Sequence, residues 1–147
     1  MLAGAVYLPD FDEMYTASAN GPARCNDKLI KPTDTSSIDQ GMLLYGLGKS
    51  PDSNASPYDG VRTLYHKFHI TRVMGAAAVD LCFVACGKAD AYIDNQIHIW
   101  DVAAGGLIAQ RAGAHLSLLE QEEGRIQVIC STPGISDELI SLTTDLL

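Results

Sequence analysis

Hydrophobic and polar positions follow two different patterns, one before and one after residue 40. In residues 3–30, short apolar runs are separated by turn-forming residues, and 3–8, 13–17 and 23–30 have the composition of strands. This spacing predicts an antiparallel β-hairpin segment at the N-terminal end. The polar stretch 31–40 that follows is the best candidate for a boundary within the chain.

From residue 42 onward, strand-like and helix-like segments alternate. Residues 42–47 and 91–93 are short apolar runs typical of buried strands, whereas residues 75–86 are alanine-rich and apolar on nearly every side, which favours a buried helix. We also predict strands over 70–73, 115–119 and 126–130, and helices capped by Ser56 with Pro57 in the first turn, by Asp101, and by Ser136. This order predicts an α/β fold with a layered mixed sheet and flanking helices, preceded by the hairpin.

Charge and composition narrow the possible partners. The 147 residues include 18 Asp and Glu against 10 Lys and Arg, so the net charge is −8, which argues against nucleic acid and anionic membranes as partners. No apolar run is long enough to cross a bilayer. The four cysteines include no C-x-x-C pair, so we expect reduced thiols and a cytoplasmic location.

Two acidic residues in the second half are the best candidates for binding chemistry. Asp94 ends a predicted strand and Asp101 begins a predicted helix, and ligands of α/β proteins bind at such ends of strands and helices. Two carboxylates there suit a divalent cation or the hydroxyl groups of a polar substrate. A purely structural interpretation also remains open, in which Asp101 is a helix cap and Asp94 is a loop acid.

Several motifs resemble one known family. The sequence reads D-A-Y at 90–92, W-D-V-A-A-G at 100–105 and G-A-A at 75–77, with G-A-V-Y at 4–7 near the N-terminal end. In these motifs the chain resembles the C-terminal half of the inositol monophosphatase family, the Mg²⁺-dependent, lithium-sensitive phosphatases. The resemblance covers essentially the whole chain and is strongest between residues 72 and 114.

The resemblance implies a role for individual residues. Asp101 matches the family's metal-binding aspartate, and Asp94 matches the acid, usually Glu, that bonds substrate hydroxyls. Gly75, Ala76 and Ala77 match the turn whose backbone lies against the substrate. The family's reaction is hydrolysis of phosphate monoesters, so the implied cofactor is Mg²⁺ and the implied partner is a small phosphorylated polyol or sugar.

The same resemblance also implies that parts of the site are missing. The family's other metal ligands, a Glu and the D-P-[IL]-D-G-T motif, precede the hairpin, so we expect no catalytic residue on this chain by itself. Residues 1–35 would then belong to the sheet of an absent N-terminal domain, and residues 36–147 would form the C-terminal α/β domain. We therefore expect an inactive chain that forms a homodimer or associates through exposed strands. A non-catalytic binding or assembly module is the alternative, and whether the chain is an enzyme stays open.

Overall fold

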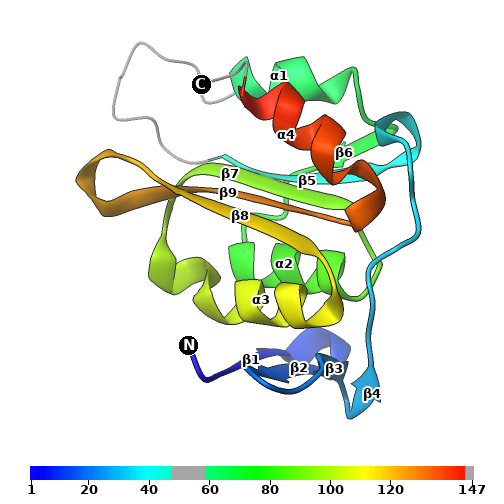
Figure 1. Ribbon diagram of the computed structural model, residues 1–147, viewed down its shortest axis with the longest axis vertical. Coiled ribbons are helices and arrows are strands. Elements are labelled where there is room, and N and C mark those ends of the chain that lie inside the picture. Colours follow the sequence, from blue (N-terminus) through cyan, green and yellow to red (C-terminus); the bar gives the residue numbers. More distant parts are fainter. Residues whose placement is uncertain (48–58, 145–147) are drawn as a thin grey trace.

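The computed structural model describes residues 1–47 and 59–144, which are arranged in four layers (Figure 1). Helices α1 and α4 lie above a five-stranded sheet B, helices α2 and α3 lie below it, and a four-stranded sheet A lies below those helices. The helices are α1 (Asp59–Tyr65), α2 (Ala77–Ala85), α3 (Ile99–Ala112) and α4 (Ser136–Thr144). The predicted α/β fold with a mixed sheet and an antiparallel hairpin segment is confirmed.

Sheet B is parallel on one side and antiparallel on the other. In spatial order its strands are β6 (Ile70–Arg72), β5 (Met42–Gly46), β7 (Ala91–His98), β9 (Arg125–Ser131) and β8 (His115–Glu120). Strand β5 runs parallel to both β6 and β7, whereas β9 runs antiparallel to β7 and β8. Because helices cover both faces, β5 and the first three residues of β7 are apolar runs rather than alternating ones.

Sheet A consists of antiparallel strands in chain order. Its strands are β1 (Ala3–Leu8), β2 (Glu13–Ser18), β3 (Arg24–Cys25) and β4 (Lys28–Leu29). The strand predicted over 23–30 is interrupted, because Asn26 and Asp27 both adopt positive φ angles and turn the chain back on itself. Left-handed backbone is tolerated best by glycine, asparagine and aspartate, so this pair of residues suits a tight turn.

The hydrophobic core lies on both sides of sheet B. One cluster joins sheet B to α2, α3 and sheet A, and its fully buried members include Tyr15, Leu81, Tyr92, Ile108 and Val128. The other cluster joins sheet B to α1 and α4, and its members include Leu43, Leu64, Ile93, Ile129 and Leu139. Sheet A therefore shares the core of the helices it covers.

The junction between β7 and α3 differs from the prediction. We predicted a strand over 91–93 and a helix capped by Asp101, but β7 continues to His98 and His98 occupies the N-cap position. The prediction that Asp101 is the N-cap is therefore wrong. The strand continues because Ile97 and His98 pair with Ile126 and Arg125 of β9, after a register shift that follows Asp94.

Two further predicted helix starts have different outcomes. Ser136 was expected to cap the last helix, but its backbone is already helical and its hydroxyl donates a hydrogen bond to the Pro133 carbonyl, so that prediction is wrong. A 3₁₀ turn over Pro133–Ile135 leads into α4 instead. The predicted start at Ser56 and Pro57 lies outside the described residues.

Candidate functional site

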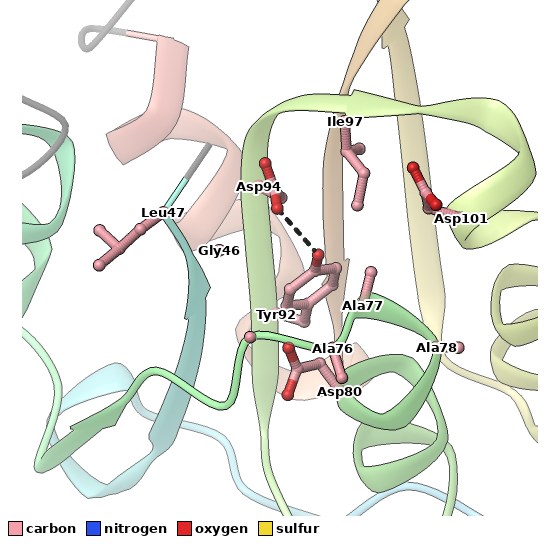
Figure 2. Close-up of a pocket in the computed structure, with 11 residues that line it drawn as sticks. Gly46, Leu47, Ala76, Ala77, Ala78, Asp80, Tyr92, Asp94, Ile97 and Asp101 are labelled. Carbon is pink, nitrogen blue, oxygen red and sulfur yellow. Dashed lines mark hydrogen bonds between the residues drawn. The ribbon is translucent and has the colours of Figure 1, made fainter. Parts of the chain in front are cut away.

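A cavity of about 400 Å³ opens where β5 and β7 end and where α2 and α3 begin (Figure 2). It is lined by Gly46, Leu47, Gly75, Ala76, Ala77, Ala78, Asp80, Tyr92, Asp94, Ile97 and Asp101. The carboxyl ends of parallel strands are the usual place for ligands in an α/β sheet. All five residues that the sequence marked as candidates, Gly75, Ala76, Ala77, Asp94 and Asp101, line this cavity.

Asp94 is held in place by two hydrogen bonds. The Tyr92 hydroxyl donates to Asp94 Oδ2 at 3.2 Å, and the Gln96 backbone N–H donates to Asp94 Oδ1 at 3.0 Å. Burial raises the pKa of this carboxyl, the two hydrogen bonds oppose that rise, and the charge of Asp101 adds to it. Each carboxylate oxygen has room for another donor, so Asp94 can still accept a hydrogen bond from a ligand.

Gly46 provides the space that Asp94 occupies. The two residues are direct partners in the pairing of β5 with β7. A Cβ atom built on Gly46 would overlap the Asp94 carboxylate, so only glycine fits beside this orientation of the acid. Sequence reasoning missed Gly46, because a glycine at the end of a strand is equally consistent with an ordinary turn.

The turn before α2 presents backbone to the cavity. Gly75 has φ of +77°, a left-handed conformation that favours glycine, and Ala76 is the extended N-cap residue of α2. The first amides of a helix are not used by its own i→i−4 hydrogen bonds, and the helix dipole makes that end attractive to anions. The Ala76 amide donates to Asp80, so Gly75 and Ala77 are the residues of this turn that can offer N–H donors to a negatively charged or hydroxyl-bearing ligand.

Asp80 is a second buried acid in the lining, and sequence reasoning missed it. Its side chain is only 1% exposed, and Oδ1 has no hydrogen-bond partner in the described part of the chain. Burial, and then the charge of Asp94, raise its pKa to about 7, although a hydrogen bond from the Ala76 backbone opposes the rise. Asp80 is the only charged residue within the apolar segment 75–86, and this contrast was the signal that could have found it.

Asp101 lies across the cavity from Asp80. It is exposed in the first turn of α3, and Figure 2 shows it on the same side of the cavity as Asp94, with Tyr92 between Asp94 and Asp80. An acid in the first turn of a helix is favoured by the helix dipole. The carboxylate is therefore both exposed to solvent and close enough to Asp94 to affect its pKa.

The described residues do not make a complete metal centre. Over residues 1–47 and 59–144 there is no group of three His, Cys, Asp or Glu side chains placed to hold a metal ion. Mg²⁺ requires octahedral oxygen coordination and is usually held by one or two carboxylates together with waters and substrate phosphate. Asp101 and Asp94 can therefore contribute to such a site but cannot build it by themselves.

The arrangement is suited to binding a polar, anionic small molecule. It combines buried acceptors for hydroxyl groups, backbone donors at the start of α2 and one exposed carboxylate. In the part of the chain that the structure describes, no helix is long and apolar enough to cross a membrane.

Comparison with known proteins identifies one family by a family model and by individual relatives. Residues 1–145 match the model of the inositol monophosphatase family. A protein of Aquifex aeolicus named fructose-1,6-bisphosphatase/inositol-1-monophosphatase is 31% identical over 142 residues, which cover 96% of this chain and 54% of that protein. Human inositol monophosphatase 1 is 36% identical over 116 residues, which cover 77% of this chain and 42% of that protein.

Solved structures agree with these sequence matches. Mycobacterium tuberculosis SuhB superposes with a TM-score of 0.85 at 31% identity, covering 98% of this chain and 59% of that one. The inositol monophosphatase from Anabaena superposes with a TM-score of 0.86 at 28% identity and with the same coverage, 98% and 59%. The chain spans about half the length of the curated relatives that it matches.

Proposed function

The chain belongs to the inositol monophosphatase family and matches its C-terminal half, and on this premise we propose that it forms the substrate-binding portion of a Mg²⁺-dependent phosphomonoesterase. The substrate class is an inositol or sugar monophosphate. One observation carries the proposal: residues 75–77, Asp94 and Asp101, which lie far apart along the sequence, line a single cavity at the carboxyl end of sheet B.

Each residue has a distinct role in this proposal. Asp94, already oriented by Tyr92 and Gln96, accepts hydrogen bonds from the hydroxyl groups of the polyol or sugar. The backbone at 75–77 lies against the substrate and donates from the amides of its first and last residues. Asp101 supplies one carboxylate to a Mg²⁺ site whose remaining ligands come from outside the described residues.

We further propose that this chain is inactive by itself. Water activation and neutralisation of the phosphate charge in this class of enzyme depend on bound metal ions. The described residues supply too few metal ligands for that task, so binding without hydrolysis is the expected behaviour of the isolated chain.

The domain assignment is part of the proposal. Residues 1–35 would belong to a sheet that continues in another polypeptide segment, and residues 36–147 would form the C-terminal α/β domain. Strand β1 supports this, because in the described structure it pairs with β2 and with no strand on its other side. Exposed edges of this kind pair readily, so a homodimer or another association through β1 is the expected oligomeric state.

We place the protein in the cytoplasm. All four cysteines are free thiols, which suits a reducing compartment. The acidic net charge of −8 supports small molecules rather than nucleic acid as ligands.

Measurement of phosphate release tests the proposal. The chain is assayed with inositol 1-phosphate and Mg²⁺, both by itself and fused behind the N-terminal half of Mycobacterium tuberculosis SuhB. We expect no turnover from the chain by itself and Mg²⁺-dependent turnover from the fusion. Asp94→Asn in the fusion should weaken substrate binding, and Asp101→Asn should reduce turnover. Hydrolysis by the isolated chain would overturn the incomplete-site proposal.

The second candidate is a non-catalytic binding module. It is favoured by the absence of any three-ligand metal group from the described residues. Such a module would bind the polyol phosphate in the same cavity. Its fusion to the N-terminal half of SuhB would then release no phosphate, whereas a control in which the same half is joined to the C-terminal half of SuhB would hydrolyse the substrate.

A further inference from the structure

A second cavity, of about 380 Å³, lies between sheet A and the C-terminal end of α2. Two cysteines from distant parts of the sequence line it, Cys25 in β3 and Cys86 at the C-cap of α2. Both are partly exposed, whereas Cys82 and Cys130 are buried. No residue of this cavity lines the cavity that contains Asp94, so the two sites are separate.

Tyr15 is a neighbour of both cysteines. Its hydroxyl lies 3.4 Å from Cys86 Sγ and donates its hydrogen to Glu13 Oε2 at 2.7 Å, and the Cys86 thiol also has the Phe83 carbonyl oxygen as an acceptor at 3.7 Å. Cys25 is the cross-strand partner of Tyr15, which places both side chains on the same face of sheet A. Cys25, Tyr15 and Cys86 all line the same cavity, and Tyr15 and Cys86 both affect the pKa of the Cys25 thiol.

An ammonium group completes the cluster. Lys88 Nζ lies 2.6 Å from both Glu13 carboxylate oxygens and 3.4 Å from the Tyr15 hydroxyl. Burial and the charge of Glu13 raise the pKa of the Cys25 thiol, and the charge of Lys88 opposes that rise. Cys25 and Cys86 are both partly exposed and line the same cavity, so an oxidant that enters it can reach both thiols.

We propose that Cys25 and Cys86 form a reversible redox pair that a peroxide closes into a disulfide between sheet A and α2. One thiol, as its thiolate, attacks a peroxide oxygen and becomes a sulfenic acid, and one water leaves. The other thiol then attacks the sulfenic sulfur, the S–S bond forms, and a second water leaves. The two cysteines lose two hydrogen atoms in total, and hydrogen peroxide is reduced to two molecules of water.

The positions of the two cysteines allow the backbone to adjust when the disulfide closes. Cys86 follows the last helical residue of α2 and precedes Gly87, which has φ of +76°. Cys25 ends a strand of two residues and is followed by the left-handed turn at Asn26 and Asp27. Both sulfur atoms are therefore carried by ends of elements, where the backbone adjusts more easily than in the middle of a helix or strand.

Peptide mapping after oxidation tests the pair. The reduced chain is treated with hydrogen peroxide, alkylated, digested without reductant and analysed by mass spectrometry. We expect a peptide that links Cys25 to Cys86, a monomer lighter by two hydrogen atoms, and reversal by dithiothreitol. The oxidised chain should also melt at a higher temperature, because the bond closes a long loop of the unfolded chain.

Matched variants separate the pair from general thiol oxidation. Cys25→Ser and Cys86→Ser should each abolish the linked peptide, whereas Cys130→Ala should retain it. Phenylarsine oxide, which bridges two nearby thiols, should bind the reduced wild-type chain and neither serine variant. Independent oxidation of the two cysteines without a link, links only between molecules, or equal arsenical binding by the serine variants would overturn the proposal.

Discussion

Gly46 and Asp94 form a steric pair at the edge of the candidate site. Gly46→Ala should destabilise the protein by about 1–3 kcal/mol, because the added methyl group overlaps the carboxylate and forces it to move. Urea unfolding of the variant and the wild type measures this loss. In an Asp94→Gly background the obstacle is gone, so the same change should cost much less. An equal cost in both backgrounds would show that the carboxylate is not the obstacle.

Asp80 should make the stability of the protein depend on pH. Its pKa is about 7 in the folded state against 3.8 as the ordinary value, so between these values the folded state retains a proton that the unfolded state has lost. The free energy of unfolding should therefore fall as the pH rises from about 4 to about 7, and should level off above that. Asp80→Asn should flatten this slope when urea unfolding is repeated across the range. Asp94, whose pKa is also raised, contributes a residual slope of the same sign.

Asp101 lies in the first turn of α3, so replacing it should have a small effect on stability and a large effect on activity. Asp101→Asn should cost the isolated chain only about 0.3–1 kcal/mol, because it removes a favourable interaction with the helix dipole and no capping hydrogen bond. In the SuhB fusion the same change should lower phosphate release by orders of magnitude, because a metal ion would lose a charged ligand. Thermal melting and kinetics decide this, and unchanged turnover would exclude Asp101 as a metal ligand.

At the residue scale, sequence motifs located part of the site. Residues 75–77, Asp94 and Asp101 could be found because they belong to motifs with fixed spacing, and they do line one cavity. Gly46 and Asp80 could not be found in this way. Their importance depends on neighbours brought by other segments: Gly46 matters because of Asp94 on the next strand, and Asp80 because α2 is buried.

The packing of α2 against α3 depends on Gly105. A Cβ atom there would lie 2.9 Å from Leu81 Cβ and 3.3 Å from the Ala78 carbonyl oxygen, so the two helices approach at this point. Gly105→Ala should destabilise the protein by about 1–3 kcal/mol despite the better helix propensity of alanine. Gly106→Ala is the matched control, because its Cβ would meet only the flexible end of Leu116 at 3.0 Å. Thermal melting of both variants tests this, and an equal loss would contradict it.

At the element scale, the sequence predicted the type of most elements better than their ends. The alanine-rich segment over 75–86 was predicted as a buried helix, and α2 is that helix. The end of β7 could not be predicted from local sequence, because three of the residues 95–98 are polar and Ile97 and His98 are held in the strand by pairing with β9. Because β9 comes almost 30 residues later in the sequence, the local pattern ended β7 too early. The start and the N-cap of α3 were therefore assigned to Asp101 instead of to His98.

The edge of β1 should determine the oligomeric state. We expect a concentration-dependent dimer in sedimentation velocity, because β1 offers six residues of extended edge and Tyr7 and Met14 are exposed on the same sheet. Ala5→Lys should shift the protein toward monomer, because a charged side chain on an edge strand opposes pairing. Ser18→Lys adds the same charge to β2, which is flanked on both sides, and should have less effect. A monomer at all concentrations would contradict the prediction.

At the scale of the whole molecule, the order of elements was sufficient to predict the class of fold. It could not predict that sheet A packs on α2 and α3 and shares their core through Tyr15. The contact depends on a close approach in which a Cβ on Gly4 would lie 3.1 Å from the Ala104 carbonyl oxygen. Such contacts between distant segments leave no periodic pattern in the sequence.

The register shift in β7 also constrains how the length of this protein can vary. Three residue steps on β7, from Asp94 to Ile97, span two steps on β9, from Val128 to Ile126, so β7 carries one extra residue. Deleting that residue would restore regular pairing between β7 and β9. It would also either turn the side chains beyond Asp94 to the opposite face of the sheet or rotate α3 by about 100° about its axis. Asp101 would then leave the cavity. Insertions and deletions between Asp94 and Asp101 should therefore be rare among functional descendants of this chain, even where substitutions are tolerated.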